Sequence, residues 1–379
     1  MPVERVELPS PAPGTRRHLL LHRFGQAGAR PKAYLQAGLH GDELPGVMIL
    51  AHLLDRLAGL ERAGAVRGEV VVVPVANPVG LSQFVMGCHT GRYDLDRMTN
   101  FNRGWPDLGE ALAGRLAGRL GDEPGANAAL AREALAALAA ELPGDGENEA
   151  LRRTLFAAAV DADVVLDLHC DSEAVTHLYL GTPLWPDAED LARDTGAEAT
   201  LLAEVSGGHP FDEALSGPWW ALARRFPDSP LPPACLATTI EYRGFLDVGG
   251  PRAREDAEGL LRLLTRRGIV AGDPGPLPPL KADASPLAGV AMVPSPMAGV
   301  VDYAAEPGQR IAAGDLLATV FDPMLPAGEG LAARRELRSP VAGVLFAREA
   351  FRVARPGAVL CKVAGAEPLP GREGRLLTD

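Results

Sequence analysis

The stretch AYLQAGLHGDELPGVMILAHLLDRLAGL, residues 33–60, joins a short apolar segment, a polar turn and an amphipathic segment. Residues 33–37 are mostly apolar and are followed by a glycine, a pattern typical of a buried strand. From 44 to 60, apolar side chains recur at helical spacing, which predicts a helix with one apolar face: Val47, Leu50, Leu54 and Leu57. A buried strand followed directly by such a helix favours an α/β fold.

Three more short, apolar segments rich in β-branched residues are predicted strands: residues 69–75, 163–168 and 235–240. Because strands alternate with helical stretches, we expect a mostly parallel or mixed central sheet with helices on both faces. The Ala- and Leu-rich segment 107–151 predicts two or three helices inserted between strands. The first 270 residues are therefore expected to form one α/β domain.

A Pro- and Gly-rich linker is expected at 271–284, and a smaller all-β domain at 285–379. Two similar phrases lie in this second domain: SPMAGVV at 295–301 and SPVAGVL at 339–345. Each places a turn before an apolar strand, which indicates two halves of a small β-structure.

Bulk composition narrows the class of protein. The chain has 379 residues, 47% hydrophobic and 23% charged, an ordinary balance for a packed protein. Its net charge of -12 argues against nucleic-acid binding, which needs a basic face. The four cysteines show no disulfide framework, and no stretch is long enough for a signal-peptide core or a membrane span. A cytoplasmic location is expected, and a homo-oligomer is one expectation because symmetric assemblies are common.

Three predicted strand ends carry side chains that bind metals or transfer protons. His40 and Glu43 follow the first strand within a single turn, His169 follows the strand at 163–168, and Glu241 follows the strand at 235–240. Ligands of open α/β sheets bind outside the carboxyl ends of the strands. Two histidines and one carboxylate suit Zn²⁺ and leave a fourth position for water. The sequence therefore predicts one zinc ion per chain, held by His40, Glu43 and His169.

Glu241 is the expected general acid/base. Zinc lowers the pKa of a bound water to about 7, and a nearby carboxylate must then take up the proton. Asp42 and Asp167 flank the ligands and could orient the histidines, although Asp167 could equally form a buried structural hydrogen bond.

A predicted loop at 91–106 supplies groups that bind anions. It contains Arg92, Arg97, Asn102 and Arg103. An arginine fork binds a carboxylate through two hydrogen bonds, and an asparagine adds a donor. These residues predict a clamp for a small carboxylate substrate.

The ordered set of motifs resembles the succinylglutamate desuccinylase/aspartoacylase family of the zinc carboxypeptidase superfamily. The matching phrases span residues 30–265: HGDE (40–43), Asn77-Pro78, Phe-Asn-Arg (101–103), DLH (167–169) and Glu241 after an apolar strand. The resemblance implies a zinc carboxypeptidase-like fold with the ligands and general acid/base named above. It also implies that Asn102 and Arg103 grip the substrate carboxylate.

The same resemblance implies an arginine shortly before this pair that polarises the scissile carbonyl. Arg92, in Gly-Arg-Tyr, matches the family's phrase better than Arg97 does, but its spacing to Arg103 is longer than usual. The C-terminal phrases resemble a biotinyl/lipoyl-type β-module. Because no lysine lies between Lys281 and Lys362, we expect a structural or gating module beside the active site rather than a carrier.

These observations predict a zinc-dependent amidohydrolase that acts on a small N-acyl amino acid or a related carboxylate-bearing metabolite. A metallocarboxypeptidase acting on peptide C-termini would use the same residues, and only the depth of the pocket separates the two. A non-catalytic binding protein is the third hypothesis, and the complete set of ligand and proton-transfer residues counts against it.

Overall fold

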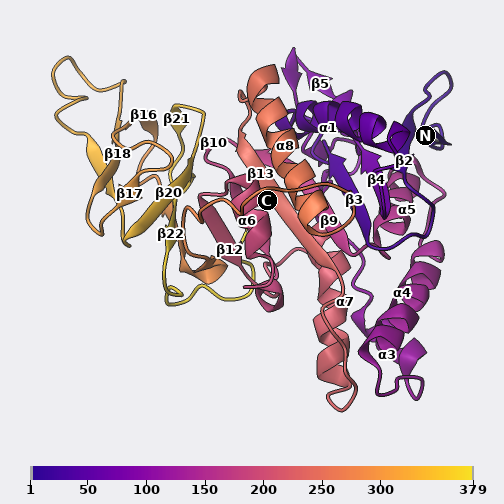
Figure 1. The fold of residues 1–379 in the computed structure, drawn as a ribbon. Helices are drawn as coiled ribbons and strands as arrows, with labels where there is room; N and C mark the ends of the chain where they lie inside the picture. Colours follow the sequence, from indigo (N-terminus) through magenta and orange to yellow (C-terminus); the bar gives the residue numbers. More distant parts are fainter. Residues whose placement is uncertain (1–2, 378–379) are drawn as a thin grey trace.

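The structure is a computed structural model that describes residues 3–377. Its centre is a nine-stranded mixed sheet in the order β1-β2-β4-β3-β9-β13-β11-β12-β14 (Figure 1). The bounds of these strands are β1 Val3–Glu7, β2 His18–Phe24, β3 Lys32–Ala37, β4 Glu69–Val73, β9 Val164–Asp171, β11 His177–Leu180, β12 Ala199–Leu202, β13 Leu236–Gly244 and β14 Ser285–Pro286. Strands β4, β3, β9 and β13 run parallel, whereas β2 and β11 pair antiparallel with this central group. The predicted mixed α/β sheet is confirmed.

The central strands are buried on both faces, because alternate side chains point to opposite sides of a strand. In β3, Tyr34 belongs to one apolar cluster, and Ala33 and Leu35 belong to another on the opposite face. Val71 and Val72 of β4 divide between the clusters in the same way.

Helices cover both faces of this sheet (Figure 1). Apolar side chains of α1, α6 and α8 pack on one face, and those of α3, α4, α5 and α7 pack on the other. The bounds are α1 Pro45–Arg62, α2 Pro78–Leu81, α3 Gly109–Leu116, α4 Pro124–Ala140, α5 Glu147–Ala159, α6 Glu189–Thr195, α7 Phe211–Arg225 and α8 Gly250–Arg266. No helix within residues 3–377 is long and apolar enough to cross a bilayer.

Two predicted strand ends were placed too early. Strand β9 continues to Asp171 and β13 to Gly244, so His169 and Glu241 lie within strands rather than after them. Both strands extend because β13 pairs with β9 through the Glu241–His169 register position. Residues 211–220 belong to α7, and its Trp219 and Trp220 are buried.

The remaining strands form further sheets. One has the order β10-β20-β22-β15, with β17 paired to β20, and another has the order β19-β18-β16-β21. Their bounds are β10 Glu173–Ala174, β15 Val290–Pro294, β16 Gly299–Tyr303, β17 Arg310–Ile311, β18 Leu316–Phe321, β19 Arg335–Arg338, β20 Gly343–Arg348, β21 Val353–Ala354 and β22 Val359–Gly365. Two short hairpins, β5 Phe84–Val85 with β6 Cys88–His89 and β7 Tyr93–Asp94 with β8 Thr99–Asn100, precede α3.

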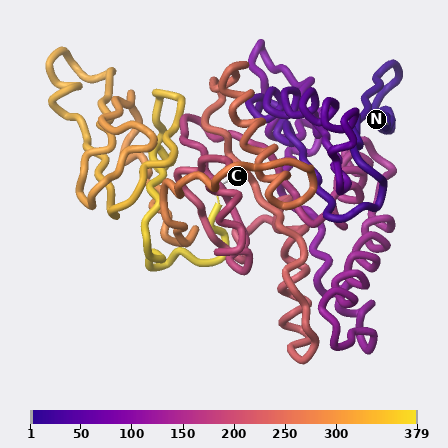
Figure 2. The backbone as a smooth tube through the Cα atoms, viewed as in Figure 1, coloured from indigo at the N-terminus to yellow at the C-terminus, as the bar shows by residue number. Residues whose placement is uncertain are grey.

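The strands from β15 to β22 form a lobe beside the β12 end of the central sheet, and the chain after β22 runs back toward that sheet (Figure 2). The two repeated phrases adopt the same local turn in this lobe. Ser295 Oγ donates to the carbonyl of Met297, and Ser339 Oγ donates to the carbonyl of Val341, at 2.7 and 2.6 Å. The lobe is tied to the central sheet because β10, which follows β9 closely, pairs with β20.

Candidate active site

Three of the predicted residues meet at the carboxyl ends of adjacent strands. His40 and Glu43 lie in the turn between β3 and α1, and His169 lies near the end of β9. All three are buried, and one ligand atom from each lies within 4.8 Å of the others. His40 Nδ1 is 2.8 Å from Glu43 Oε1, and His169 Nδ1 is 2.7 Å from Glu43 Oε2. A group of this kind could hold a metal ion.

The second nitrogen of the His40 ring is fixed by a buried amide. Asn100 Oδ1 accepts the backbone N–H of Asn102 at 2.8 Å, which identifies this atom as the oxygen. His40 Nε2, 2.9 Å from the same oxygen, must therefore donate. This tautomer leaves the lone pair of Nδ1 facing Glu43.

Asp167 lies beside the ring of His169 and is held by a chain of hydrogen bonds. His169 Nε2 lies 2.9 Å from Asp167 Oδ2, and Asp167 Oδ1 accepts from Gln36 Nε2 at 3.0 Å. The hydroxyl of Tyr34 donates to Gln36 Oε1 at 2.7 Å, which fixes the orientation of that amide. Asp167 is therefore held within ion-pair distance of His169 Nε2, while His169 Nδ1 faces Glu43.

The corresponding expectation for Asp42 is wrong. Within residues 3–377, its Oδ1 is buried without a hydrogen-bond partner, and Asn100 takes the orienting position at His40 instead. Sequence reasoning missed Asn100, which stands 60 positions after His40, because neither local pattern nor spacing links the two. Its place two residues before Asn102 was the only available signal.

The structure separates the two candidate arginines. Arg92 NH1 donates to Glu43 Oε1 at 3.0 Å and to His40 Nδ1 at 3.2 Å, so its guanidinium lies at the three-residue group. Arg97 instead forms an ion pair with Glu149, and its side chain is 47% exposed. Only Arg92 is placed to act on a group bound beside His40 and Glu43.

Asn102 and Arg103 line the same cavity from the segment after β8. Asn102 is buried, its Nδ2 lies 3.4 Å from His169 Nε2, and its Oδ1 accepts the backbone N–H of Phe211 at 2.9 Å. Arg103 NH1 donates to the carbonyl of Asn102 at 2.8 Å. The predicted pair therefore lies next to His169 and is anchored to the first residue of α7.

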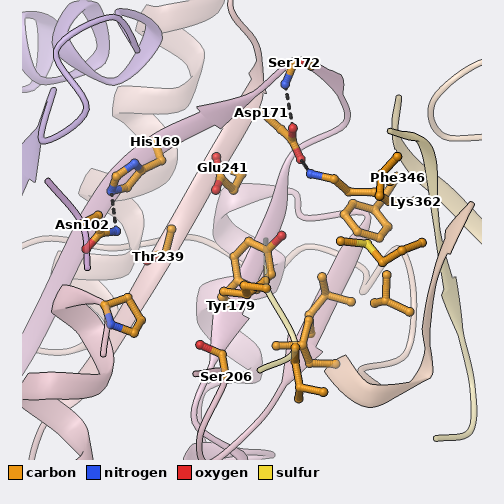
Figure 3. A pocket seen from close by; sticks show the side chains of 18 of the residues that line it. Asn102, His169, Asp171, Ser172, Tyr179, Ser206, Thr239, Glu241, Phe346 and Lys362 are labelled. Atoms are coloured by element: carbon orange, nitrogen blue, oxygen red, sulfur yellow. Dashed lines mark hydrogen bonds and ion pairs between the residues drawn. The ribbon is translucent and has the colours of Figure 1, made fainter. Parts of the chain in front are cut away.

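Glu241 extends from β13 with its carboxylate directed toward His169 (Figure 3). Its Oε2 is buried and has no hydrogen-bond partner among the described residues. Burial and the nearby Glu43 raise the pKa of Glu241 to about 8. A bound dication would act in the opposite direction and favour the charged carboxylate.

A cavity of about 550 Å³ contains these groups. Part of its wall comes from the C-terminal strands, through Met292, Phe346 and Lys362. Lys362 Nζ reaches Asp171, two residues beyond His169, with its nitrogen 2.5 Å from Oδ2 (Figure 3). Sequence reasoning did not assign these residues to the site, since they are distant from the motif-bearing segments.

Arg243, two residues after Glu241, has a structural role. It forms an ion pair with Asp256 of α8 and donates to Thr176 Oγ1 at 3.2 Å. It does not line the cavity around His169.

Comparison with known proteins agrees with this geometry. Residues 29–221 match the model of the succinylglutamate desuccinylase/aspartoacylase catalytic domain. The chain belongs to this family. The family resemblance predicted from the motifs is therefore confirmed, and the chain is related to deacylating hydrolases. No curated protein matches the sequence.

Solved structures extend the likeness beyond the catalytic domain. A succinylglutamate desuccinylase/aspartoacylase family protein from Shewanella amazonensis SB2B is 28% identical, with a TM-score of 0.82 over 96% of this chain and 98% of that chain. A second protein described in the same way, from Shewanella frigidimarina NCIMB 400, is 26% identical, with a TM-score of 0.84 over 96% and 97% of the two chains. The ectoine utilization protein EutE (DoeB) from Ruegeria pomeroyi shares the fold at 18% identity, with a TM-score of 0.67 over 96% and 97%.

Proposed function

We propose that this member of the family is a zinc-dependent deacylase that cleaves the amide bond of a small N-acyl amino acid or a related carboxylate-bearing metabolite. One observation carries the proposal. Nδ1 of His40 and Nδ1 of His169 both face the carboxylate of Glu43 in a buried site, at 2.8 and 2.7 Å. Two histidines and one carboxylate that converge in this way form a ligand set suited to zinc.

His40, Glu43 and His169 would hold the ion, which supplies a Lewis acid and lowers the pKa of a coordinated water. Glu241, whose Oε2 has no hydrogen-bond partner within residues 3–377, accepts the proton from the attacking water and passes it to the departing amine. Arg92 brings a positive charge to the place where negative charge develops on the carbonyl oxygen.

The proposed substrate class rests on two further residues that line the cavity. Asn102 and Arg103 supply amide and guanidinium donors beside His169, a combination suited to a carboxylate. A volume of about 550 Å³ is typical of pockets that enclose a small molecule. The strands of the C-terminal lobe form part of the wall, and we propose that they restrict access by longer peptides.

The first experiment measures metal content by elemental analysis of the purified protein. We expect about one zinc per chain in the wild type and little in His40→Ala or His169→Ala. His52→Ala, on α1 outside the cavity, is the matched control and should keep its metal. A wild type that neither carries zinc nor takes it up from solution would contradict the proposal.

The second measurement is amine release from N-acetyl and N-succinyl amino acids, with short peptides as the competing substrate class. The metal-loaded wild type should hydrolyse an N-acyl amino acid. Glu241→Gln should keep its zinc and lose activity by about 10²- to 10⁴-fold, because it cannot accept the proton. Preferred cleavage of peptide C-termini would identify a carboxypeptidase instead.

A further inference from the structure

Beyond the groups used above, the cavity extends toward the start of α7. Thr239 and Tyr179 line its middle, and Ser206 lies farther from His169 and Glu241 (Figure 3). The first turn of α7 adds two consecutive acidic residues, Asp212 and Glu213, to this part of the wall. The proposed chemistry at His169 and Glu241 gives neither of them a role.

Asp212 is the unusual member of the pair. The residue is only 6% exposed, and its Oδ1 is buried without a hydrogen-bond partner within residues 3–377. None of the ion pairs recorded in that range includes it. Only the backbone N–H of Glu213 acts on the carboxylate as a hydrogen-bond donor. Burying a carboxylate with so little compensation is costly, so its retention indicates a partner outside the chain.

Glu213, in contrast, already has partners. Its Oε1 accepts the backbone N–H of Ser206 at 2.5 Å. Burial raises the pKa of Glu213, while this contact and the nearby His209 and Arg103 act in the opposite direction. The charge of Glu213 is therefore partly balanced inside the protein, which leaves Asp212 as the acidic group available to a ligand.

A capping role does not explain Asp212. The helix begins at Phe211, with Pro210 at the N-cap position and no side-chain cap. Asn102 takes up the backbone N–H of Phe211, and Ser216 Oγ donates to the backbone carbonyl of Asp212 rather than to its carboxylate. Its Oδ1 thus makes no capping hydrogen bond within residues 3–377, and the residue lines the cavity.

We propose that Asp212 binds a cationic group on the amino acid released by the enzyme, so that the preferred substrates are N-acyl derivatives of a basic amino acid. This inference rests on the proposed deacylase function. The geometry supports it because Asn102, which we assign to the carboxylate clamp, contacts the residue directly before Asp212. An amino acid held by its carboxylate at Asn102 and Arg103 can therefore extend its side chain toward Asp212.

The electrostatics of the site agree with this assignment. Burial, with Glu213 and Asp167 nearby, raises the pKa of Asp212 to about 7. An ammonium or guanidinium group would remove that penalty, because an opposite charge favours the ionised carboxylate. The resulting hydrogen bond would be charge-assisted and shielded from water, and such contacts discriminate strongly against ligands that lack the charge.

The test compares side chains of matched size on one acyl group. Metal-loaded wild type is assayed with N-acetyl-L-lysine and N-acetyl-L-ornithine, with the uncharged N-acetyl-L-norleucine and N-acetyl-L-norvaline, and with N-acetyl-L-glutamate; the N-succinyl series is run in parallel. We expect kcat/KM for the basic substrates to exceed that for the uncharged ones by about tenfold or more. Asp212→Asn should reduce this ratio to within about threefold, mainly through KM, and preserve activity on the uncharged substrates.

Asp228→Asn is the matched control, because it removes the same charge at an exposed position after α7. It should leave the ratio unchanged. Asp212→Ser serves as a second variant in case Asp212→Asn does not fold. Equal or better hydrolysis of uncharged or acidic substrates by the wild type, or an unchanged ratio in the Asp212 variants, overturns the inference and leaves the deacylase function standing.

Calorimetric titration with free L-lysine and L-norleucine separates the two proposals when no substrate is cleaved. Lysine binding that is tighter than norleucine binding and is lost in Asp212→Asn would support the cation subsite, although the deacylase function would then fail. If the wild type binds lysine no more tightly than norleucine, the proposed role of Asp212 in binding a cationic group is overturned.

Discussion

At the scale of single residues, the site depends on side chains that never face the cavity's centre. Asn100 holds His40 in one tautomer because the same oxygen that accepts from Nε2 also accepts a backbone N–H. Asp167 Oδ2 lies 2.9 Å from Nε2 of His169, and its Oδ1 accepts from Gln36. Such outer contacts fix the direction of the ligand lone pairs and raise their basicity.

Asn100→Ala tests this arrangement. Without the amide, the His40 ring can rotate or shift its proton to Nδ1, so zinc affinity should fall by about 10- to 100-fold. The measurement is competition for zinc with a chelator of known affinity. Asn148→Ala is the control, because Asn148 contacts Asp94 rather than a predicted ligand and should bind zinc as the wild type does. Equal affinity in Asn100→Ala would show that other contacts orient His40.

At the scale of elements, two turns meet backbone to backbone beside the ligands. The backbone N–H of Gly41 donates to the carbonyl of Gly91 at 2.9 Å, which joins the His40–Glu43 turn to the segment that carries Arg92. A Cβ atom on Gly91 would lie 2.3 Å from the nitrogen of Asp42, a distance that no side chain can adopt without moving the backbone. Glycine is therefore required here by close approach rather than by chain flexibility.

Gly91→Ala should separate these two turns. We expect a loss of about 1–3 kcal/mol in unfolding free energy together with weaker zinc binding, because Arg92 and the first two ligands move relative to each other. Thermal unfolding and zinc content check the two effects. Gly114→Ala in α3, where an added Cβ meets nothing within 4 Å, should be neutral or stabilising. Normal zinc binding by Gly91→Ala would show that the two turns move independently.

At the scale of the whole molecule, the C-terminal lobe is joined to the central sheet by charge and by packing. Lys362 of β22 pairs with Asp171 of β9, and Arg348 and Arg352 pair with Glu173 of β10. An apolar cluster that includes Leu201 and Phe346 lies at the same boundary. The lobe therefore contacts the strand that carries His169 within a few residues of that ligand.

Lys362→Met should destabilise the chain in a pH-dependent way. Burial raises the pKa of Asp171, but Lys362 and His177 outweigh it and hold that pKa below 3.8. The pair thus contributes stability above the unfolded-state pKa and loses it as the pH falls through the folded-state value. We expect a cost of at most about 3 kcal/mol near pH 7, and a smaller cost as Asp171 becomes protonated in acid.

Urea unfolding at several pH values measures this cost. Lys281→Met is the control, because its ion pair with Glu198 is half exposed and should contribute less than about 1 kcal/mol. A cost that is the same at pH 7 and in acid would mean that Lys362 acts through packing rather than charge.

Much of the fold followed from local pattern. The four predicted strands and the helix after the first of them are present, because buried strands and amphipathic helices carry their periodicity in neighbouring residues. Strand ends were less predictable. Pairing between β9 and β13 extends both strands beyond their apolar cores, and this pairing joins residues about 70 positions apart.

The residues of the candidate site also divide into those that the sequence indicated and those that only the tertiary structure revealed. His40 and Glu43 lie three residues apart in one turn, so their approach was set by the sequence itself, and the order of the motifs indicated His169 and Glu241. Tertiary structure alone decided between Arg92 and Arg97, placed Asn100 rather than Asp42 behind His40 and brought Lys362 to the cavity. It also left Oδ1 of Asp212 without a hydrogen-bond partner within residues 3–377. Each of these facts depends on which distant segments pack together, and a contact between distant segments leaves no periodicity or spacing in the chain.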